Sequence, residues 1–402
     1  MKILQVNKFF YHKGGTETYL FALIELLKNH DQEVAVFSQK NPQNRANNEE
    51  KYFLNPIDLE KFHWQNIFKI GRIFWSYAAS RQIKKVIKAT SPDLVHLHNI
   101  YHQLSPSILP AIKSFGLPIV MTVHDFKLVK YDYALPINQK KSRHKNSRLA
   151  DWLLKAEFTF HRRTKIYQKY VDLFIAPSEF VKNELIAAGF DVNKICVLPH
   201  FLDLPLAPEA QPIKKENTIL YFGRLDESKG VDILIRAFAG LAAKYPAWQL
   251  KIIGSGPKEN EWRELAEKLK IINQIIFIPQ LPKKELGQEI QKAQFAVAPS
   301  RLHETFGLSV AEALAYGLPV VATKNGGYQE LIQDNENGFL VPSEDVLAIQ
   351  EKMEQLIINT DLREKMSEAA KISVAELTPE KHYQEIIKIY KKFVQTEKNS
   401  TT

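Results

Sequence analysis

Two glutamates, Glu304 and Glu312, lie eight residues apart on either side of a stretch that could hold an anion. That stretch contains Phe306, Gly307 and Leu308, where the sequence predicts that a helix begins. Backbone N–H groups at a helix N-terminus lack intrahelical partners, and the helix dipole favours a phosphate there. Helical geometry would separate the two glutamates by roughly 12 Å, too far to share a proton. The pattern indicates an extended ligand with hydroxyls at both ends and an anionic middle.

Short apolar runs on both sides predict the elements that position these residues. A strand is expected over 295–299, a helix over 308–316 that Gly317 ends, and a buried strand over 318–323 that leads into Gly326 and Gly327. An earlier strand and helix, within 218–241, enclose a loop with Arg224 and Lys229. Two cations five residues apart at the end of a strand can both reach a diphosphate.

The first half of the chain has its own candidate residues. Gly14 and Gly15 lie between a predicted strand and a predicted helix, a layout that binds phosphate but is also compatible with a plain tight turn. The pattern is not GxGxxG, which disfavours a nicotinamide enzyme. His124 follows a buried strand at the edge where open parallel sheets bind ligands, although it could also be a structural histidine. His96 and His98, on one face of another strand, are weaker candidates.

These motifs resemble a known family. The sequence Glu-x7-Glu followed by EAxAxGxPVVAxxxGGxxEL is similar to the donor-site signature of the retaining nucleotide-sugar glycosyltransferases of family 4, in glycosyltransferase group 1. The segment GRLxxxKG, which includes Gly223, Arg224 and Lys229, matches the family pattern as well. The resemblance covers nearly the whole chain, but no motif is recognised over residues 126–169.

The resemblance implies an α/β protein of the GT-B class, in which two Rossmann-like doubly wound domains face each other across a cleft. We expect an acceptor-side domain over residues 1–200, a proline-containing linker over 201–216 and a donor-binding domain over 217–378. A C-terminal helix over 379–396 is expected to pack back on the first domain, as the family's last helix does.

The resemblance also assigns roles to individual residues. Glu304 would bind hydroxyls of the transferred sugar, Glu312 would bind the ribose, and His124 would orient the sugar. The diphosphate would be neutralised by the two cations and three backbone groups of the signature, together with the glycine pair: Arg224, Lys229, Phe306, Gly307, Leu308, Gly14 and Gly15. Retention without an evident carboxylate nucleophile implies front-face attack. No Asp-x-Asp motif stands at a strand end, so we expect neither a metal ion nor another cofactor.

The composition of the chain indicates where the protein is located and which kind of partner it binds. The chain has 402 residues, enough for two cores, and its single cysteine, Cys196, excludes an intrachain disulfide. No apolar run reaches the roughly 20 residues of a membrane span, so we expect a cytoplasmic protein. Residues 1–200 hold 29 Lys and Arg against 17 Asp and Glu, a net charge of +12. This excess favours an anionic partner, although it could also be only a solubilising surface.

Two basic segments indicate which kind of anionic partner the protein binds. Residues 64–88 combine aromatic and basic side chains over one predicted helical segment, which is typical of an interfacial helix but also of a core helix. Residues 126–169 are predicted to be a long, irregular basic loop that captures the acceptor, with the cluster Lys140–Lys145 at its centre. We therefore expect a lipid-linked or saccharide acceptor at the inner face of an anionic membrane, and no nucleic acid.

The predicted function is transfer of a sugar from a nucleoside-diphosphate sugar to an intermediate of cell-surface glycan synthesis. Two alternatives stay open from the sequence. One is a nucleotide-sugar epimerase on the same fold, and the other is a non-catalytic nucleotide-sugar-binding protein. The second alternative is disfavoured because Arg224, Lys229 and Glu304 are all present.

Overall fold

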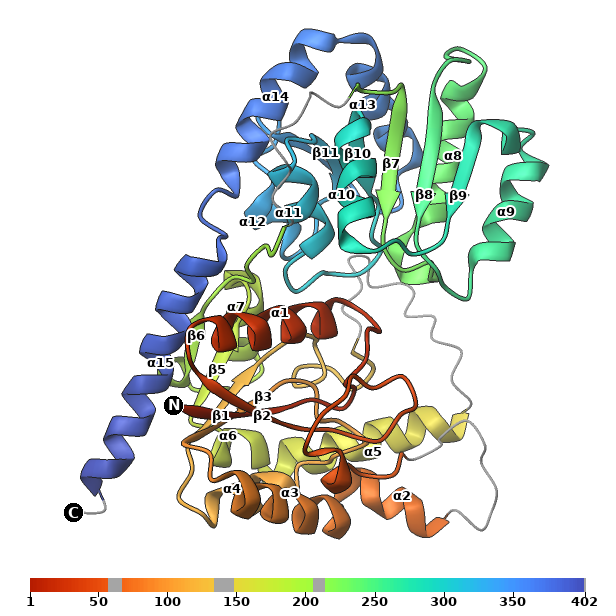
Figure 1. Ribbon diagram of the computed structural model, residues 1–402. Helices are drawn as coiled ribbons and strands as arrows, with labels where there is room; N and C mark the ends of the chain where they lie inside the picture. The colour runs from red at the N-terminus through yellow and green to blue at the C-terminus, as the bar shows by residue number, and fades with distance from the viewer. Residues whose placement is uncertain (57–66, 134–147, 205–213, 401–402) are drawn as a thin grey trace. The chain divides into compact units, whose positions relative to one another are not determined.

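The computed structural model describes residues 1–56, 67–133, 148–204 and 214–400 (Figure 1). Contacts divide the chain into two compact units, and each is described by itself below. Among the described residues, the first unit contains 1–56, 67–133, 148–201 and 379–400, and the second contains 202–204 and 214–378. The predicted linker over 201–216 falls mostly outside the described residues.

The first unit contains a parallel sheet of six strands in the order β2-β1-β3-β4-β5-β6. Strands β3, β4 and β5 are buried along their whole length, because helices cover both faces of the sheet. The strands are β1 (Lys2–Val6), β2 (Glu33–Phe37), β3 (Leu94–Leu97), β4 (Ile119–Thr122), β5 (Leu173–Ala176) and β6 (Ile195–Val197).

The helices of the first unit form two layers (Figure 1). On one face, Leu23 and Leu27 of α1 and Ile386 and Tyr390 of α15 join one hydrophobic cluster with strand residues. Helices α3, α4, α5 and α6 lie on the other face. The helices are α1 (Gly15–Asn29), α2 (Ile67–Phe74), α3 (Tyr77–Thr90), α4 (Ile108–Lys113), α5 (Arg148–Thr164), α6 (Ile166–Tyr170), α7 (Glu179–Ala187) and α15 (Pro379–Ser400).

The prediction of an irregular loop over residues 126–169 is wrong for its second half. Residues 148–170 form α5 and α6 instead. The helical period was missed because the inward positions of α5 include Glu157 and His161, which are polar but buried. Those two positions are four apart and share one face of the helix. The cluster Lys140–Lys145 lies outside the described residues.

The single helical segment predicted over residues 64–88 is also corrected. It contains two helices, α2 and α3, which are separated by the non-helical residues Trp75 and Ser76. The Ser76 hydroxyl caps α3 by accepting the Ala79 N–H at 3.1 Å, which satisfies one orphan donor of the new helix. Tyr77 is 81% exposed, whereas Ile73 is buried, so the segment has both a solvent face and a core face. Trp64 lies outside the described residues.

The second unit contains a parallel sheet in the order β12-β11-β10-β7-β8-β9. Alternate residues of β7 face opposite helix layers: Ile219 and Tyr221 join the cluster with α8, α9 and α13, whereas Leu220 and Phe222 join the cluster with α10, α11 and α12. The predicted doubly wound arrangement is confirmed. The strands are β7 (Thr218–Phe222), β8 (Gln249–Ile253), β9 (Ile275–Ile278), β10 (Phe295–Ala298), β11 (Val320–Thr323) and β12 (Gly338–Val341). The helices are α8 (Val231–Ala242), α9 (Glu259–Lys268), α10 (Lys283–Lys292), α11 (Leu308–Ala315), α12 (Tyr328–Leu331), α13 (Val346–Ile358) and α14 (Thr360–Ser373).

Within the described ranges, no helix combines the length and the apolar character that crossing a bilayer requires.

Candidate functional site

The predicted donor residues of the second unit converge where the strand order of its sheet reverses. Strands β7 and β10 are neighbours, with β8 on one side and β11 on the other. Both are parallel, so the loops that follow them leave the same edge of the sheet. Open α/β sheets bind their ligands at such a switch point, beyond the carboxyl ends of the strands. The loop after β7 contains Gly223, Arg224 and Lys229, and the loop after β10 contains Glu304.

The loop after β7 and the loop after β10 contact each other through their backbones and side chains. Gly230 lies between Lys229 and α8 in the left-handed region, with φ of 68°, and a Cβ there would be 2.1 Å from the carbonyl oxygen of Pro299. Only glycine permits this approach without displacing the backbone. Arg301 donates its N–H to the Ser228 carbonyl at 2.7 Å, and its guanidinium forms two 2.7 Å bonds with Asp232. The positions of the two loops are thus coupled.

Lys229 and Glu304 form an ion pair in which Nζ and Oε1 are 2.7 Å apart. The Ser300 hydroxyl donates to the same oxygen at 2.9 Å. The lysine and glutamate side chains are 29% and 20% exposed, so solvent and a ligand can still reach them. A partly exposed pair contributes little to stability, which leaves both groups able to take a ligand as partner.

Arg224 is the most accessible cation of the cluster. Its side chain is 59% exposed, and Nη2 lies 3.2 Å from a carboxylate oxygen of Asp226. Asp226 is itself a capping residue, because it accepts the Ser228 N–H at 3.0 Å at the start of a short 3-10 turn, Glu227–Lys229. The guanidinium is therefore oriented by a carboxylate and remains open to an anion on its other side.

Helix α11 begins at Leu308, as predicted, and its cap is Gly307 with φ of 103°. A Cβ at Gly307 would be 2.6 Å from the ring of Tyr328, so glycine is required both by conformation and by space. Glu304 lies four residues before the helix. The estimate of 12 Å from helical geometry is therefore wrong in its premise, because three of the seven residues between the glutamates, 305–307, precede the helix.

The turn after β11 holds this loop from the other side. The Gly327 N–H donates to the carbonyl of Glu304 at 2.8 Å, and the Gly326 N–H donates to Nδ1 of His303 at 2.9 Å. The predicted glycine pair therefore positions the backbone beside Glu304. Sequence reasoning missed His303 and Ser300, because a histidine and a serine within a loop give no periodic signal.

Glu312 occupies α11 in an environment that opposes its charge. Burial raises the pKa of its carboxyl to about 7, although Lys283 on α10 acts in the opposite direction. The carboxyl has no hydrogen-bond partner among the residues that the structure describes. A carboxylate with this environment is suited to accept hydrogen bonds from a ligand's hydroxyls, since those bonds would favour its ionised form.

In the first unit, the sheet order reverses between β1 and β3, and the glycine pair follows β1. Gly14 caps α1 and Gly15 is its first residue, so the pair forms a helix N-terminus as predicted. Asn7 donates to the buried Glu17 carboxylate at 3.0 Å and accepts the Asn99 N–H at 3.0 Å. These bonds join α1 to the ends of both central strands.

His124 follows β4 and lies in a network of neutral rings. Its Nε2 is 2.8 Å from Nδ1 of His98, whose Nε2 is 2.8 Å from Oε1 of Gln5. Burial lowers the pKa of His124 to about 3 and that of His98 well below its usual range, with neighbouring histidines adding to the effect on His98. At neutral pH, His124 can exchange hydrogen bonds with a hydroxyl but cannot supply a positive charge.

More distant residues complete this network, and sequence reasoning missed most of them. His200 stacks near Tyr19 with ring centroids 4.2 Å apart, and His382 of α15 lies 2.9 Å from the Tyr19 hydroxyl. His96 is a structural residue, because both its ring nitrogens bond within the core at 2.7 Å, to Tyr390 and Thr122. Only the HLH alternation in β3 gave a signal, and it did not distinguish His98 from His96.

The described residues contain no group of three or more His, Cys, Asp or Glu side chains placed to hold a metal ion. The structure groups Arg224, Lys229, Glu304, the Gly307 cap and Glu312 within the second unit. Gly14, Gly15 and His124 belong to the first unit.

Two family models match consecutive parts of the chain. The model described as "Glycosyltransferase Family 4" matches residues 13–205, and the model described as "Glycosyl transferases group 1" matches residues 206–373. The chain belongs to this family of glycosyltransferases. The two units are accordingly the two Rossmann-like domains of a GT-B protein, the fold class that the sequence predicts.

Named relatives of this glycosyltransferase differ in how much of their length is matched. An uncharacterized glycosyltransferase of Haemophilus influenzae is 35% identical over 57% of this chain, but the match spans only 65% of that relative. A phosphatidyl-myo-inositol mannosyltransferase of Mycolicibacterium smegmatis is 26% identical over 83% of this chain and 78% of its own length. Among solved structures, Anabaena HepE in complex with UDP-glucose superimposes with a TM-score of 0.69 at 19% identity, covering 98% of this chain and all of HepE.

Proposed function

We propose that this glycosyltransferase transfers a sugar from a nucleoside-diphosphate sugar to a saccharide or lipid-linked acceptor, with retention of configuration and without a metal ion. The observation that carries the proposal is the pairing of Lys229 with Glu304 at the β7–β10 switch point, in the unit that also contains the exposed guanidinium of Arg224 and the N-terminus of α11. A diphosphate needs such cations and N–H donors, and a sugar needs such a carboxylate.

In the proposed reaction, the bond between the anomeric carbon and the phosphate oxygen breaks, and its electron pair stays with the leaving diphosphate. Arg224, Lys229 and the α11 N-terminus stabilise the charge that develops there. The acceptor oxygen attacks the anomeric carbon from the face that the leaving group vacates, and its proton passes to the departing phosphate oxygen. Glu304 and the neutral His124 hold hydroxyls of the transferred sugar. The products are a glycoside of unchanged configuration and a nucleoside diphosphate.

Thermal-shift measurements against UDP, GDP, ADP and their sugars test the donor class. A ligand that binds only the native state raises the melting temperature, by RT ln(1 + [L]/Kd) in free energy. The UDP-glucose complex of HepE makes UDP-sugars the first candidates. If none of these nucleotides shifts the transition, donor binding by the second unit is refuted. Turnover that persists in excess EDTA, and NMR of the product's anomeric proton, test metal independence and retention.

Epimerisation is the second candidate function, and the glycosyltransferase names of the relatives disfavour it. Incubation with donor alone separates the two. An epimerase converts the donor into a second nucleotide sugar, whereas a transferase at most hydrolyses the donor slowly to free sugar and nucleoside diphosphate.

A lipid-linked acceptor of cell-surface glycan synthesis, with peripheral binding to an anionic membrane, is the acceptor class that the charge favours. The mycobacterial relative is named for transfer to a phosphatidylinositol. Each basic side chain near an anionic surface contributes about 1 kcal/mol, and salt screens it within a Debye length. Wild type should co-sediment with phosphatidylglycerol vesicles at low salt, and a variant with Gln at positions 140, 141, 143 and 145 should bind less. Wild type that stays in the supernatant at low salt would exclude this partner.

A further inference from the structure

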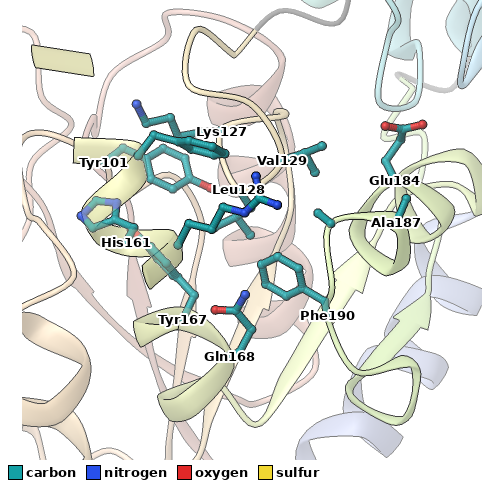
Figure 2. A pocket seen from close by; sticks show the side chains of 13 residues that line it. Tyr101, Lys127, Leu128, Val129, His161, Tyr167, Gln168, Glu184, Ala187 and Phe190 are labelled. Carbon is teal, nitrogen blue, oxygen red and sulfur yellow. The ribbon is translucent and has the colours of Figure 1, made fainter. Parts of the chain in front are cut away.

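The segment after β4 borders two different surroundings. Lys127, Leu128 and Val129 line a cavity of about 240 Å³ together with residues of α5, α6 and the end of α7 (Figure 2). His124 precedes them in the chain and is not part of that wall, and its Nε2 lies 2.8 Å from Nδ1 of His98, just after β3. His124 is half-buried and so remains in part open to solvent. What it offers a ligand depends on which of its two ring nitrogens carries the proton.

The rings of His124 and His98 are both neutral at physiological pH. Burial lowers the pKa of His124 to about 3 and that of His98 well below its usual range. Each ring therefore has one N–H group and one lone pair, and the bond between them needs one of each. Two arrangements are possible. Either Nε2 of His124 donates and its Nδ1 keeps the lone pair, or Nδ1 of His98 donates and the proton of His124 is on Nδ1.

Gln5 of β1 decides between the two arrangements. Its Oε1 lies 2.8 Å from Nε2 of His98. An amide oxygen only accepts hydrogen bonds, so Nε2 of His98 carries the proton and Nδ1 of His98 has the lone pair. His124 must then donate from Nε2. Gln5 and His98 are both fully buried, so bulk water does not compete for these bonds.

The other side of the Gln5 amide faces the Tyr390 hydroxyl of α15. Burial raises the pKa of Tyr390 well above its usual range, and the Gln5 side chain acts in the opposite direction. An amide has this effect when its NH2 group is on the side of the phenol, because that group favours the ionised form. Nε2 of Gln5 forms no hydrogen bond of ordinary geometry within the described chain, so the orientation is electrostatic. A reversed amide would place a donor against His98 and invert both histidines.

We propose that Gln5 is a positioning residue that sets the tautomer of His124 through His98, so that Nδ1 of His124 is a hydrogen-bond acceptor. The tautomer stands independently of the transfer chemistry. Its use rests on the proposed function, in which His124 holds a hydroxyl of the transferred sugar. With this tautomer, the sugar hydroxyl donates to Nδ1.

NMR of the full chain labelled with 15N-histidine tests the tautomer without any ligand, because protonated and unprotonated ring nitrogens differ clearly in 15N shift. In wild type, His124 should carry its proton on Nε2, and the signals that vanish in His124→Phe identify it. Gln5→Leu leaves the Nε2–H of His98 buried without an acceptor, which is costly. The proton of His124 should therefore move to Nδ1. Gln43→Leu changes an exposed glutamine of the same unit and should leave the spectrum unchanged.

Turnover provides a second readout. Gln5→Leu should lower kcat/KM about tenfold, since the inverted His124 ring loses its bond with the sugar hydroxyl. The affinity for a free nucleoside diphosphate, measured by calorimetry, should stay that of the wild type. Gln5 is fully buried and touches no sugar itself, so this loss has to pass through His98.

The inference is overturned if His124 of the wild type carries its proton on Nδ1, a result that needs no variant to fold. It is also overturned if Gln5→Leu folds and leaves the tautomer of His124 unchanged. An inverted tautomer with wild-type kcat/KM would show that transfer does not use Nδ1. If the tautomers are as expected but no nucleotide sugar is bound or consumed, the role of Gln5 is kept and the proposed function is rejected.

Discussion

The two units build their polar sites in different ways. In the second unit, the candidate residues come from three short loops that follow β7, β10 and β11, and a glycine or a capping side chain fixes each loop. In the first unit, the polar groups around His124 come from segments as far apart as Gln5, His98 and His382. The first kind of site is encoded locally, and the second exists only after tertiary packing.

This difference predicts which substitutions change activity and which change the stability of the fold. A loop residue of the second unit can be removed without a cost to folding, because its side chain is partly exposed and its neighbours are held by backbone contacts. A polar residue of the first unit is buried with its partner, so its removal leaves an uncompensated charge or dipole. Substitutions in the two units should therefore affect different measurements.

The largest effect is expected at Lys127, which is 1% exposed and paired at 2.9 Å with Glu157, which is fully buried. Lys127→Met should lower the free energy of unfolding by about 3–5 kcal/mol, because the glutamate is left charged and without its cation. Burial raises the pKa of Glu157, but the hydrogen bond with His102 and the charge of Lys127 outweigh burial and lower the pKa to about 2. Urea denaturation of the first unit measures the loss.

The control for Lys127 is Lys182→Met, which breaks a pair with Glu179 on the surface of α7. Such pairs contribute roughly 0–1 kcal/mol. The double variant Lys127→Met with Glu157→Leu should recover most of the lost stability, since it removes both charges. A single Lys127→Met variant as stable as the wild type would mean that the pair is solvated.

The second effect concerns activity. Arg224→Ala and Lys229→Ala should each lower kcat/KM about 100-fold or more, because contacts with the leaving diphosphate strengthen in the transition state. The melting temperature should stay near that of the wild type. Lys244→Ala removes a lysine that is 65% exposed and paired with Glu354 of α13, and it should have no effect on turnover. Wild-type turnover in either Arg224→Ala or Lys229→Ala would refute the diphosphate role.

A third prediction separates the two glutamates. Glu312→Ala should weaken binding of a free nucleoside diphosphate about tenfold, because a carboxylate that accepts ribose hydroxyls contributes roughly 1.5–3 kcal/mol. Glu304→Ala should spare that binding and damage transfer, since it also releases Lys229 from its 2.7 Å pair. Calorimetry with the diphosphate measures both variants. Equal losses of affinity would contradict this division.

The same difference explains what the sequence could predict. The strands, the start of α11 and the donor residues follow from periodicity, a glycine and short motifs, and each of these signals is a pattern of neighbouring residues. Helix α5 was missed because Glu157 and His161 face the core as partners of distant residues, and the period of apolar residues is interrupted there. The His382 contact with Tyr19 links positions 363 residues apart and leaves no local pattern.

The smallest effect is a pH dependence of stability that arises from Glu312. Its pKa is about 7 in the folded protein, because of burial, and about 4.5 in the unfolded chain. Between these values the folded state binds more protons than the unfolded state, so the free energy of unfolding falls as the pH rises through this range and levels off above 7. Glu312→Gln removes the titrating group. The variant should match wild type near pH 4.5 and melt higher at pH 8. The full shift would correspond to about 3 kcal/mol. Glu312 keeps part of its surface exposed, however, so solvent screening should leave about 1 kcal/mol, or about 2–4 °C in a unit of this size. Glu354→Gln should show the opposite sign, because hydrogen bonds from Lys244 and Tyr245 lower the pKa of Glu354. Differential scanning calorimetry of the three proteins at both pH values measures these differences in melting temperature. If Glu312→Gln does not melt higher than wild type at pH 8, the Glu312 carboxylate is solvated in the free protein, and the proposal that it is held desolvated for a ribose is wrong.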